Sequence, residues 1–137
     1  MSETENQNKQ LIETFYAAFL KFDGDTMASC YHTDASFSDE VFPDLKGEMP
    51  GNMWRMLCSK LKTSPSKLSY SNVWANETEG GCDWEAEYLF SATGNTVRNI
   101  ISSRFKFADG KIIEQQDSFN FWRWSRMALG LPGVLLG

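Results

Sequence analysis

The sequence predicts an α+β fold, in which helices near the N-terminus pack on one face of a curved antiparallel sheet. In the first half of the chain, apolar residues recur every three or four positions, as on one face of a helix. From about Lys67 the period changes to two, which is typical of strands. Helices followed by strands favour a fold with the helices on one face of the sheet. At 137 residues the chain is long enough for one domain with its own core.

Three helices are expected before the sheet. The first runs from Leu11 to Phe22, because Leu11, Phe15, Ala18, Phe19 and Phe22 share one face. It follows a polar arm, residues 1–8, and ends at Gly24. Asp25 is expected to cap a second, short helix that reaches Cys30 or Tyr31. The stretch "SFSDEVF" is extended, and a third helix begins after Gly47 with the apolar set Met53, Trp54, Leu57, Cys58 and Leu61.

Four strands follow and form hairpins. Their expected ranges are Lys67–Asn76, Cys82–Ser91, Thr96–Phe107 and Lys111–Phe121. A three-residue loop at "ADG" and a two-residue turn at Thr93-Gly94 keep the apolar faces of neighbouring strands together. This register predicts an inward row of Ala86, Ile101 and Asp117. Residues 122–137 are expected to form a helical turn or two and an apolar tail, within a single domain of residues 1–137.

Polar side chains gather on this inward face, where a plain core would be apolar. The predicted neighbouring rows contain Tyr88, Asn99 and Phe119, and Trp84, Ser103 and Gln115. An ionised carboxylate there costs several kcal/mol unless it is paired, and no Lys or Arg shares the inferred face. We therefore expect Asp117 to accept hydrogen bonds from Asn99, Ser103 or Tyr88, or to have a raised pKa. The small Ala86 beside it leaves room for a ligand.

Composition excludes several classes of function. The net charge of −5, without a cluster of Lys or Arg, disfavours nucleic acid and anionic membranes as partners. The polar N-terminus is unlike a secretory signal, and no apolar stretch is long enough to span a membrane, so a cytoplasmic location is expected. Three scattered cysteines and one histidine make a metal site unexpected. No cofactor is expected either, because the chain has no phosphate loop or dinucleotide fingerprint.

The chain resembles the nuclear-transport-factor-2-like superfamily, and within it the SnoaL-like proteins. The resemblance is carried by "ETFYAAFLKFDGDTMASCYHTDASFSDEVF", "MWRMLCSKL" and "FKFADGKIIEQQDSFNFWRWSRMALG". It implies a cone-shaped, cystatin-like α+β barrel, whose curved sheet wraps a long helix around an internal cavity. This scaffold carries many unrelated activities, so function has to be argued from the site.

Within that resemblance, "DASFSDE" is similar to the segment of ketosteroid isomerases that holds the general base, which places Asp39 in that role. Ser103 stands where those isomerases have the second aspartate of the oxyanion hole, and Ala17 falls near their helix tyrosine, one position from Tyr16. Asp117 corresponds to an acid of limonene epoxide hydrolases. Those enzymes also use an Arg-x-Asp pair on a neighbouring strand, where this chain has Trp84, Ala86 and Tyr88. Neither constellation is complete.

Two functional hypotheses remain open. In the first, the protein binds a small apolar molecule in the cone, and Asp117 and Asp39 perform acid/base chemistry, with Tyr16, Trp54, Tyr88, Asn99, Ser103 and Gln115 contacting the ligand. In the second it is a non-catalytic binding or interaction module. For Asp39 the alternative to catalysis is a strand-end acid bound by backbone N–H groups. A homodimer through the outer sheet face is also expected, because Ile100, Ile112 and Trp122 fall on that face.

Overall fold

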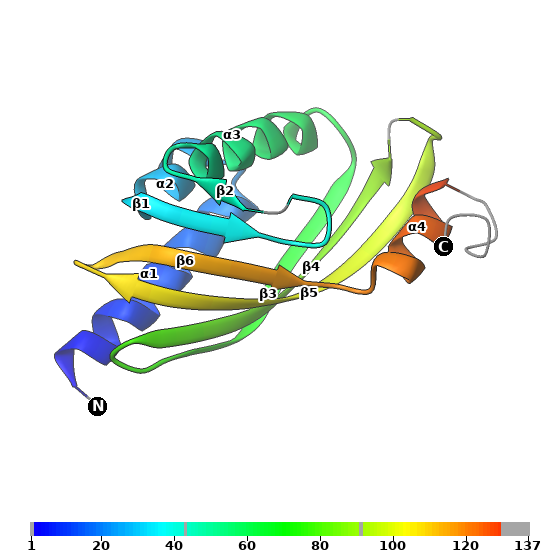
Figure 1. Cartoon of the computed structure of the whole chain (residues 1–137). Coiled ribbons are helices and arrows are strands. Elements are labelled where there is room, and N and C mark those ends of the chain that lie inside the picture. The colour runs from blue at the N-terminus through cyan, green and yellow to red at the C-terminus, as the bar shows by residue number, and fades with distance from the viewer. Residues whose placement is uncertain (1, 43, 91, 130–137) are drawn as a thin grey trace.

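The computed structural model describes residues 2–42, 44–90 and 92–129 and has the expected α+β fold (Figure 1). The described helices are α1 (Glu3–Leu20), α2 (Gly24–Ser29), α3 (Met49–Lys62) and α4 (Phe121–Leu129). The described strands are β1 (Tyr31–Ser38), β2 (Leu45–Lys46), β3 (Ser66–Ala75), β4 (Glu79–Phe90), β5 (Asn95–Ala108) and β6 (Lys111–Ser118). They form one sheet in the order β2-β1-β6-β5-β4-β3.

The sheet is mixed and open. Strands β1 and β6 run parallel, whereas the other neighbouring strands pair in the antiparallel direction that the sequence predicted. The sheet curves around α1, with α2 and α3 beside β1, and α4 lies near the turn between β4 and β5 (Figure 1). Because β2 and β3 are the two edges, the strands make a curved wall rather than a closed barrel.

Helix α1 begins earlier than its apolar pattern indicates. Ser2 caps it by accepting a hydrogen bond from the N–H of Glu5 at 3.1 Å, so the expected polar arm is helical from Glu3. Asn8 is buried, and its Nδ2 donates to the carbonyl oxygens of Asn76 and Glu77 at 3.1 and 3.2 Å. The polar first turns of α1 are therefore fixed to the loop between β3 and β4.

Aromatic rings form the centre of the core between α1, α3 and the sheet. Phe15 of α1 makes edge-to-face contacts with Tyr16, Tyr31 and Trp54, with ring centroids 5.1 to 5.6 Å apart. These rings are buried, as is Phe19 one turn further along α1. Such contacts add to the burial of large apolar surface, so they hold the two helices and β1 in a defined arrangement.

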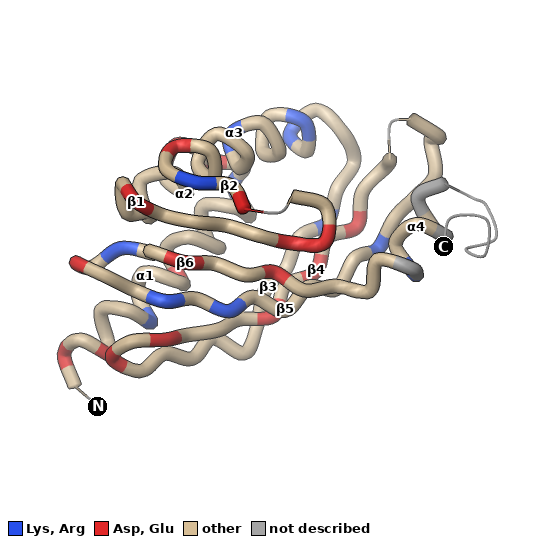
Figure 2. Tube along the Cα trace, in the orientation of Figure 1, with Lys and Arg blue, Asp and Glu red and all other residues tan. Residues whose placement is uncertain are grey.

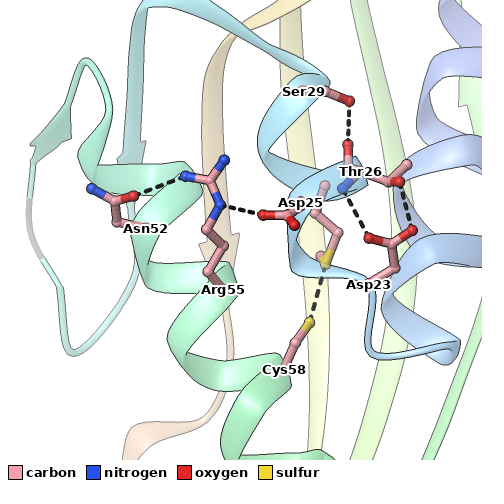
Figure 3. A network of polar contacts seen from close by, with 8 residues as sticks. Asp23, Asp25, Thr26, Ser29, Asn52, Arg55 and Cys58 are labelled. Atoms are coloured by element: carbon pink, nitrogen blue, oxygen red, sulfur yellow. Dashed lines mark hydrogen bonds and ion pairs between the residues drawn. The ribbon is translucent and has the colours of Figure 1, made fainter.

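Helices α2 and α3 approach closely and position Trp54. A Cβ atom on Gly24 would lie 2.6 Å from the Cα of Arg55, so only glycine fits there. Asp23, rather than the expected Asp25, caps α2 by accepting from the N–H of Thr26 at 3.1 Å (Figure 3). Asp25 instead accepts from Nε of Arg55 at 2.8 Å, which joins the two helices at the surface (Figure 3).

The turn between β5 and β6 differs from the predicted three-residue loop. Asp109 and Gly110 both have positive φ, 54° and 74°, and form a two-residue turn, the geometry that Asp-Gly favours. A bulge follows, since Phe107 pairs with Ile112 but Lys106 pairs with Glu114. Ile112 is consequently buried, against the expectation that it faces outward. Beyond the bulge Ser103 pairs with Asp117, where the sequence predicted Ile101 opposite Asp117.

The connection between β4 and β5 also differs. Phe90 pairs with Asn95 and Tyr88 with Val97, so four residues, 91–94, separate the strands instead of two. The predicted two-residue turn is wrong, and Asn99 lies opposite Ala86 rather than Tyr88. Because both hairpins slip by an even number of residues, the inward faces of β4 and β5 remain those predicted.

Candidate functional site

Asp117 lies on the inward face of β6 and is only 3% exposed. Its Oδ1 accepts a hydrogen bond from Oγ of Ser103, its partner on β5, at 2.5 Å. The same oxygen accepts from Nε2 of Gln115, two residues earlier on β6, at 3.0 Å. Both of these hydrogen bonds therefore use Oδ1.

Ser103 is the centre of a buried network of hydrogen bonds. Its Oγ accepts from the hydroxyl of Tyr16 at 2.7 Å and from Nε1 of Trp84 at 3.0 Å. A hydroxyl has one proton and two acceptor lone pairs, so these two donors leave the proton of Ser103 free to point at Asp117. Residues from α1, β4 and β5 thus combine to direct a single donor at the acid.

Gln115 is held in one orientation by a second chain of hydrogen bonds. Its Oε1 accepts from the hydroxyl of Tyr31 on β1, and that hydroxyl accepts from Nε1 of Trp54 on α3 at 2.7 Å. With its oxygen bound in this way, the Gln115 amide presents its N–H to Asp117. Trp54 lies on α3, which packs closely against α2. Its hydrogen bond to Tyr31 therefore connects the packing of these helices to Gln115 and, through Gln115, to the Asp117 carboxyl group.

The surroundings of Asp117 favour its protonated form. Burial raises the pKa of Asp117 from an ordinary value of 3.8 to about 7, and the nearby charge of Asp39 adds to this change. Hydrogen bonding from Ser103 and Gln115, and to a smaller extent from Trp84, opposes it. Burial and the neighbouring Asp117 also raise the pKa of Tyr16, so its hydroxyl remains a neutral donor. Near neutral pH both protonation states of Asp117 are populated.

A cavity of about 400 Å³ opens beside Asp117, and we call it the apolar cavity. It lies between the inner face of the sheet, helices α1, α3 and α4, and the segment that follows β1. Most of its wall is aliphatic or aromatic, and its polar lining residues are Asp39, Tyr88, Asn99 and Asp117. Its other lining residues are Phe19, Val41, Phe42, Leu57, Leu61, Trp84, Ala86, Phe90, Ile101, Phe119 and Trp124.

Helix α4 closes one side of the apolar cavity. Trp124 donates from Nε1 to the hydroxyl of Tyr88 at 2.8 Å, and its ring lies 5.5 Å from that of Phe90. The Tyr88 hydroxyl keeps its own proton for another acceptor. Tyr88 and Asn99 therefore place polar groups on the same apolar wall, on strands β4 and β5.

The predicted site residues fall into two groups. Asp39, Tyr88, Asn99 and Asp117 line the apolar cavity. Tyr16, Trp54, Ser103 and Gln115 do not line it; they are buried behind Asp117 and take part in the two hydrogen-bond networks. Asn99 and Tyr88, two of the three expected partners of Asp117, make no described hydrogen bond to it, whereas Ser103 does.

Tyr16 and Ser103 show why the resemblance to ketosteroid isomerases does not extend to an oxyanion hole. Tyr16 rather than Ala17 points into the core, and it does pair with Ser103. However, Tyr16 donates to Ser103, Ser103 donates to Asp117, and neither residue lines the apolar cavity. The pair therefore supports the acid instead of facing a ligand.

Asp39 follows the end of β1 and does not share the buried position of Phe37. Its Oδ1 accepts from the N–H groups of Val41 and Phe42 at 2.7 and 2.5 Å. An aspartate that bonds to backbone two and three residues ahead stabilises a turn. These contacts match the alternative interpretation of Asp39 as a strand-end acid, although the residue also lines the apolar cavity.

Several residues of the site were not predicted. The sequence predicts that the short second helix reaches Cys30 or Tyr31, but Tyr31 begins β1 and orients Gln115. The sequence predicts Trp84 on the inward face without a role, and its Nε1 donates to Ser103. The sequence does not place α4 or the β1–β2 segment at the cavity, because their placement depends on how the chain folds back over the sheet.

The described part of the chain offers no grouping of metal ligands. Among residues 2–42, 44–90 and 92–129, no three His, Cys, Asp or Glu side chains are placed so as to hold a metal ion. No helix in that part is long and apolar enough to cross a membrane. The three cysteines are unpaired and buried.

Solved structures share this fold over nearly the whole chain. A candidate SnoaL-like polyketide cyclase from Jannaschia superposes with a TM-score of 0.78 at 12% identity, covering 96% of this chain and 98% of that one. An LEH-like epoxide hydrolase from M. tuberculosis gives 0.70 at 16% identity, with 96% and 94% covered. A candidate polyketide cyclase from Xanthomonas campestris gives 0.72 at 18% identity, with 91% and 98% covered. At these identities the likeness establishes the fold alone.

Sequence comparison adds the family. No curated protein sequence matches the chain. The family model of the SnoaL-like domain matches residues 12–115, from the middle of α1 to Gln115 in β6. This range is most of the 137 residues and includes Tyr16, Trp84 and Ser103. The chain therefore belongs to the SnoaL-like domain family.

Proposed function

We propose that this protein binds a small apolar molecule in the apolar cavity and that Asp117 exchanges a proton with it. The observation that carries the proposal is a buried carboxyl group at the wall of an apolar cavity, with a pKa raised to about 7. A general acid or base works best when its pKa is near the operating pH. Burial in an apolar site is a common way to bring a carboxyl group into that range.

The hydrogen bonds around Asp117 define its part in such a reaction. Ser103 and Gln115 occupy Oδ1, which leaves Oδ2 to take a proton from the ligand or return one. A ligand with a weakly acidic C–H, such as a carbon next to a carbonyl group, suits this exchange. Tyr88 and Asn99 are the polar cavity groups that would orient a carbonyl or hydroxyl oxygen. Asp39 contributes its charge, which favours the protonated form of Asp117.

The names of proteins with the same fold agree with a small organic ligand. Proteins of the same fold are named as polyketide cyclases and as an epoxide hydrolase. Those names describe reactions on small organic molecules, which agrees with an apolar cavity of about 400 Å³. The choice among isomerase-, cyclase- and hydrolase-like reactions depends on the ligand.

Ligand binding and proton exchange are tested separately. A panel of small apolar ketones is screened by thermal shift, where a ligand at 100 times its Kd adds about 2.7 kcal/mol to the stability. The variant Ala86→Phe, which fills the cavity, should lose the shift. Ser102→Phe, on the outer face of β5, is the matched control and should keep it.

Proton exchange is then followed for each ketone that binds, as deuterium incorporation from D2O by NMR. Asp117→Asn should slow the exchange by about 10²- to 10⁴-fold, the usual contribution of a positioned acid or base. If ketones bind but wild type and Asp117→Asn exchange at the same rate, the protein is a carrier or sensor. If none of the panel binds, the proposed class of ligand is wrong.

The non-catalytic alternative keeps one specific observation in its favour. Asp39 is committed to the turn after β1, so only one of the two expected catalytic acids is free of a structural task. As part of that alternative we propose a homodimer through the outer sheet face, where Ile100 is 47% exposed. Ile112 is buried and therefore does not contribute to an outer interface, and the side chain of Trp122 lies outside the described part. Light scattering at micromolar concentration tests the dimer. A cytoplasmic location stays a prediction.

A further inference from the structure

We propose that Asp117 has a second, polar entrance, so that water and small cations reach the acid from one side while an apolar ligand occupies the other. We call this entrance the side notch; its lining residues are Ser36, Phe37, Ser38, Asp39, Glu40, Asp44, Glu114, Gln116 and Asp117. The inference rests on the proposed role of Asp117 and adds how protons and water are supplied to it.

The side notch arises where β1 leaves the sheet. Strand β1 ends at Ser38, which pairs with Gln116 of β6, but β6 continues to Ser118. On its other side β6 remains paired, because Ser118 lies opposite Ser102 of β5. In the described part of the chain, the β1 side of β6 therefore lacks a strand partner from Asp117 onward. The wall of the sheet is incomplete next to the acid.

Asp39 keeps the chain away from that edge. Its N–H donates to the carbonyl of Phe42 at 3.0 Å, while its carboxylate accepts from the N–H groups of Val41 and Phe42. This turn takes the chain out of the sheet within one residue of Ser38. The turn that Asp39 stabilises is thus also the segment that forms one side of the notch.

The side notch and the apolar cavity meet at two residues. The notch has a volume of about 510 Å³, and among the residues that the structure describes only Asp39 and Asp117 line both spaces. The apolar cavity has an aromatic and aliphatic wall, whereas the notch is lined mostly by serine, glutamine and acidic side chains. Asp117 therefore stands at the boundary between an apolar space and a polar one.

Charge decides what the side notch admits. Acidic positions lie where β1 ends and on β6 beside it (Figure 2). Four acids besides Asp117 line the notch, namely Asp39, Glu40, Asp44 and Glu114, and none of its described lining residues is basic. Lys46 and Lys106 reach two of these acids only through surface ion pairs of 3.6 and 3.8 Å. A cleft of one charge sign concentrates counter-ions, so the notch favours cations and water over anions and apolar ligands.

The side notch allows Asp117 to exchange protons with solvent while a ligand fills the apolar cavity. When an apolar ligand occupies the cavity, it blocks exchange of protons between Asp117 and solvent from that side. The side notch leaves water next to the same carboxyl group, so Asp117 regains or releases its proton without the ligand leaving. A hydrolytic reaction would receive its water by the same path.

The entrance is tested with Asp117→Cys, whose thiolate attacks the sulfenyl sulfur of a methanethiosulfonate and displaces methanesulfinate. Wild type is the background control, because Cys30, Cys58 and Cys82 are at most 3% exposed. Blocking the notch with Ser38→Phe should slow labelling by about tenfold or more, since labelling depends on access to the thiolate. Ser102→Phe, the same change on the outer face of β5, should leave it unchanged. Filling the cavity with Ala86→Phe should also leave it unchanged.

A second readout uses charge. The cationic aminoethyl reagent should label Asp117→Cys about tenfold faster than the anionic sulfonatoethyl reagent, and added salt should reduce that ratio. If Ser38→Phe does not unfold cooperatively, Gln116→Trp replaces it as the variant that blocks the notch. If Ala86→Phe does not, Asn99→Phe replaces it as the variant that fills the cavity. The inference is overturned if the cavity variant alone stops labelling, if neither block has an effect, or if the two reagents react equally. Because no ligand is used, these outcomes are independent of whether ketones bind.

Discussion

Replacing Asp117 by Asn should change how the free energy of unfolding depends on pH. Burial raises the pKa of Asp117 to about 7 in the folded protein, against an ordinary value of 3.8. Between these values the folded protein keeps a proton that the unfolded chain has released. A state that binds more protons is favoured by acid, so the wild-type free energy of unfolding falls as the pH rises through this window. Below the window both states are protonated, and above it neither is.

The size of the effect follows from the width of the window. Holding one extra proton in the folded state changes the free energy of unfolding by about 1.4 kcal/mol for each pH unit, and the window is about three pH units wide, so the wild type should lose about 4 kcal/mol across it. Asn keeps an oxygen that can accept from Ser103 and Gln115 but has no proton to titrate. Other titrating groups are common to both proteins, so the effect is best seen in the difference between them. That difference should move in favour of Asp117→Asn as the pH rises, and then level off.

The assay is urea unfolding of both proteins at intervals from about pH 3.5 to about pH 8.5, analysed by linear extrapolation. Glu114→Gln is the matched control, because it removes a carboxylate from the exposed side of the same strand. We expect a much smaller pH dependence in its difference from wild type. A constant difference between wild type and Asp117→Asn over the whole range would show that the buried acid is not held with a raised pKa, and the proposed acid/base role would lose its basis.

Three further changes test the supports of the site by the same unfolding measurement. Ser103→Ala should lower the free energy of unfolding by about 2 to 3 kcal/mol, because it leaves two buried donors without an acceptor. In a double-mutant cycle with Tyr16→Phe, the costs of the two substitutions should not add. Additive costs would contradict the hydrogen-bond network. Asp39→Ala should cost about 1 to 2 kcal/mol by removing acceptors of two backbone N–H groups, whereas Asp39→Asn should keep most of that stability; equal losses would argue against the turn. Gly24→Ala should cost about 1 to 3 kcal/mol, since its Cβ would lie 2.6 Å from the Cα of Arg55; an unchanged stability would mean that α2 and α3 have room to separate.

The faces of the strands could be predicted from the sequence because side chains alternate strictly along a strand. Ala86, Ile101 and Ser103 are buried as the alternation predicted, although both hairpin registers are wrong by two residues. An even slip changes which residues are opposite one another and leaves their side of the sheet unchanged. Ile112 is the exception, because it precedes a bulge that the alternation does not reveal.

The division between cavity wall and supporting network could not be predicted. Alternation and helical spacing assign a residue to a face, and Tyr16, Ser103 and Asp117 all belong to inward faces. Whether an inward side chain meets a ligand or lies behind another side chain depends on the register and on the elements that cover the sheet. The pairing of Ser103 with Asp117 requires both the Asp-Gly turn and the bulge after it. The position of Asp39 at the notch depends on where β1 leaves β6, which a single sequence does not specify.

The arrangement of donors around Asp117 is itself an argument for a role in proton exchange. A buried acid kept for stability alone is expected to be ionised and paired with a cation, because an unpaired buried charge is costly. Here the groups that donate to the carboxyl group are neutral, namely Ser103 and Gln115, which both use Oδ1, with a smaller contribution from Trp84. The remaining carboxyl oxygen belongs to a residue that lines an apolar cavity and a polar notch. A group that accepts hydrogen bonds on one oxygen, has a pKa near neutral pH and lies at the boundary of two chemically different spaces fits the proposed transfer of a proton between them.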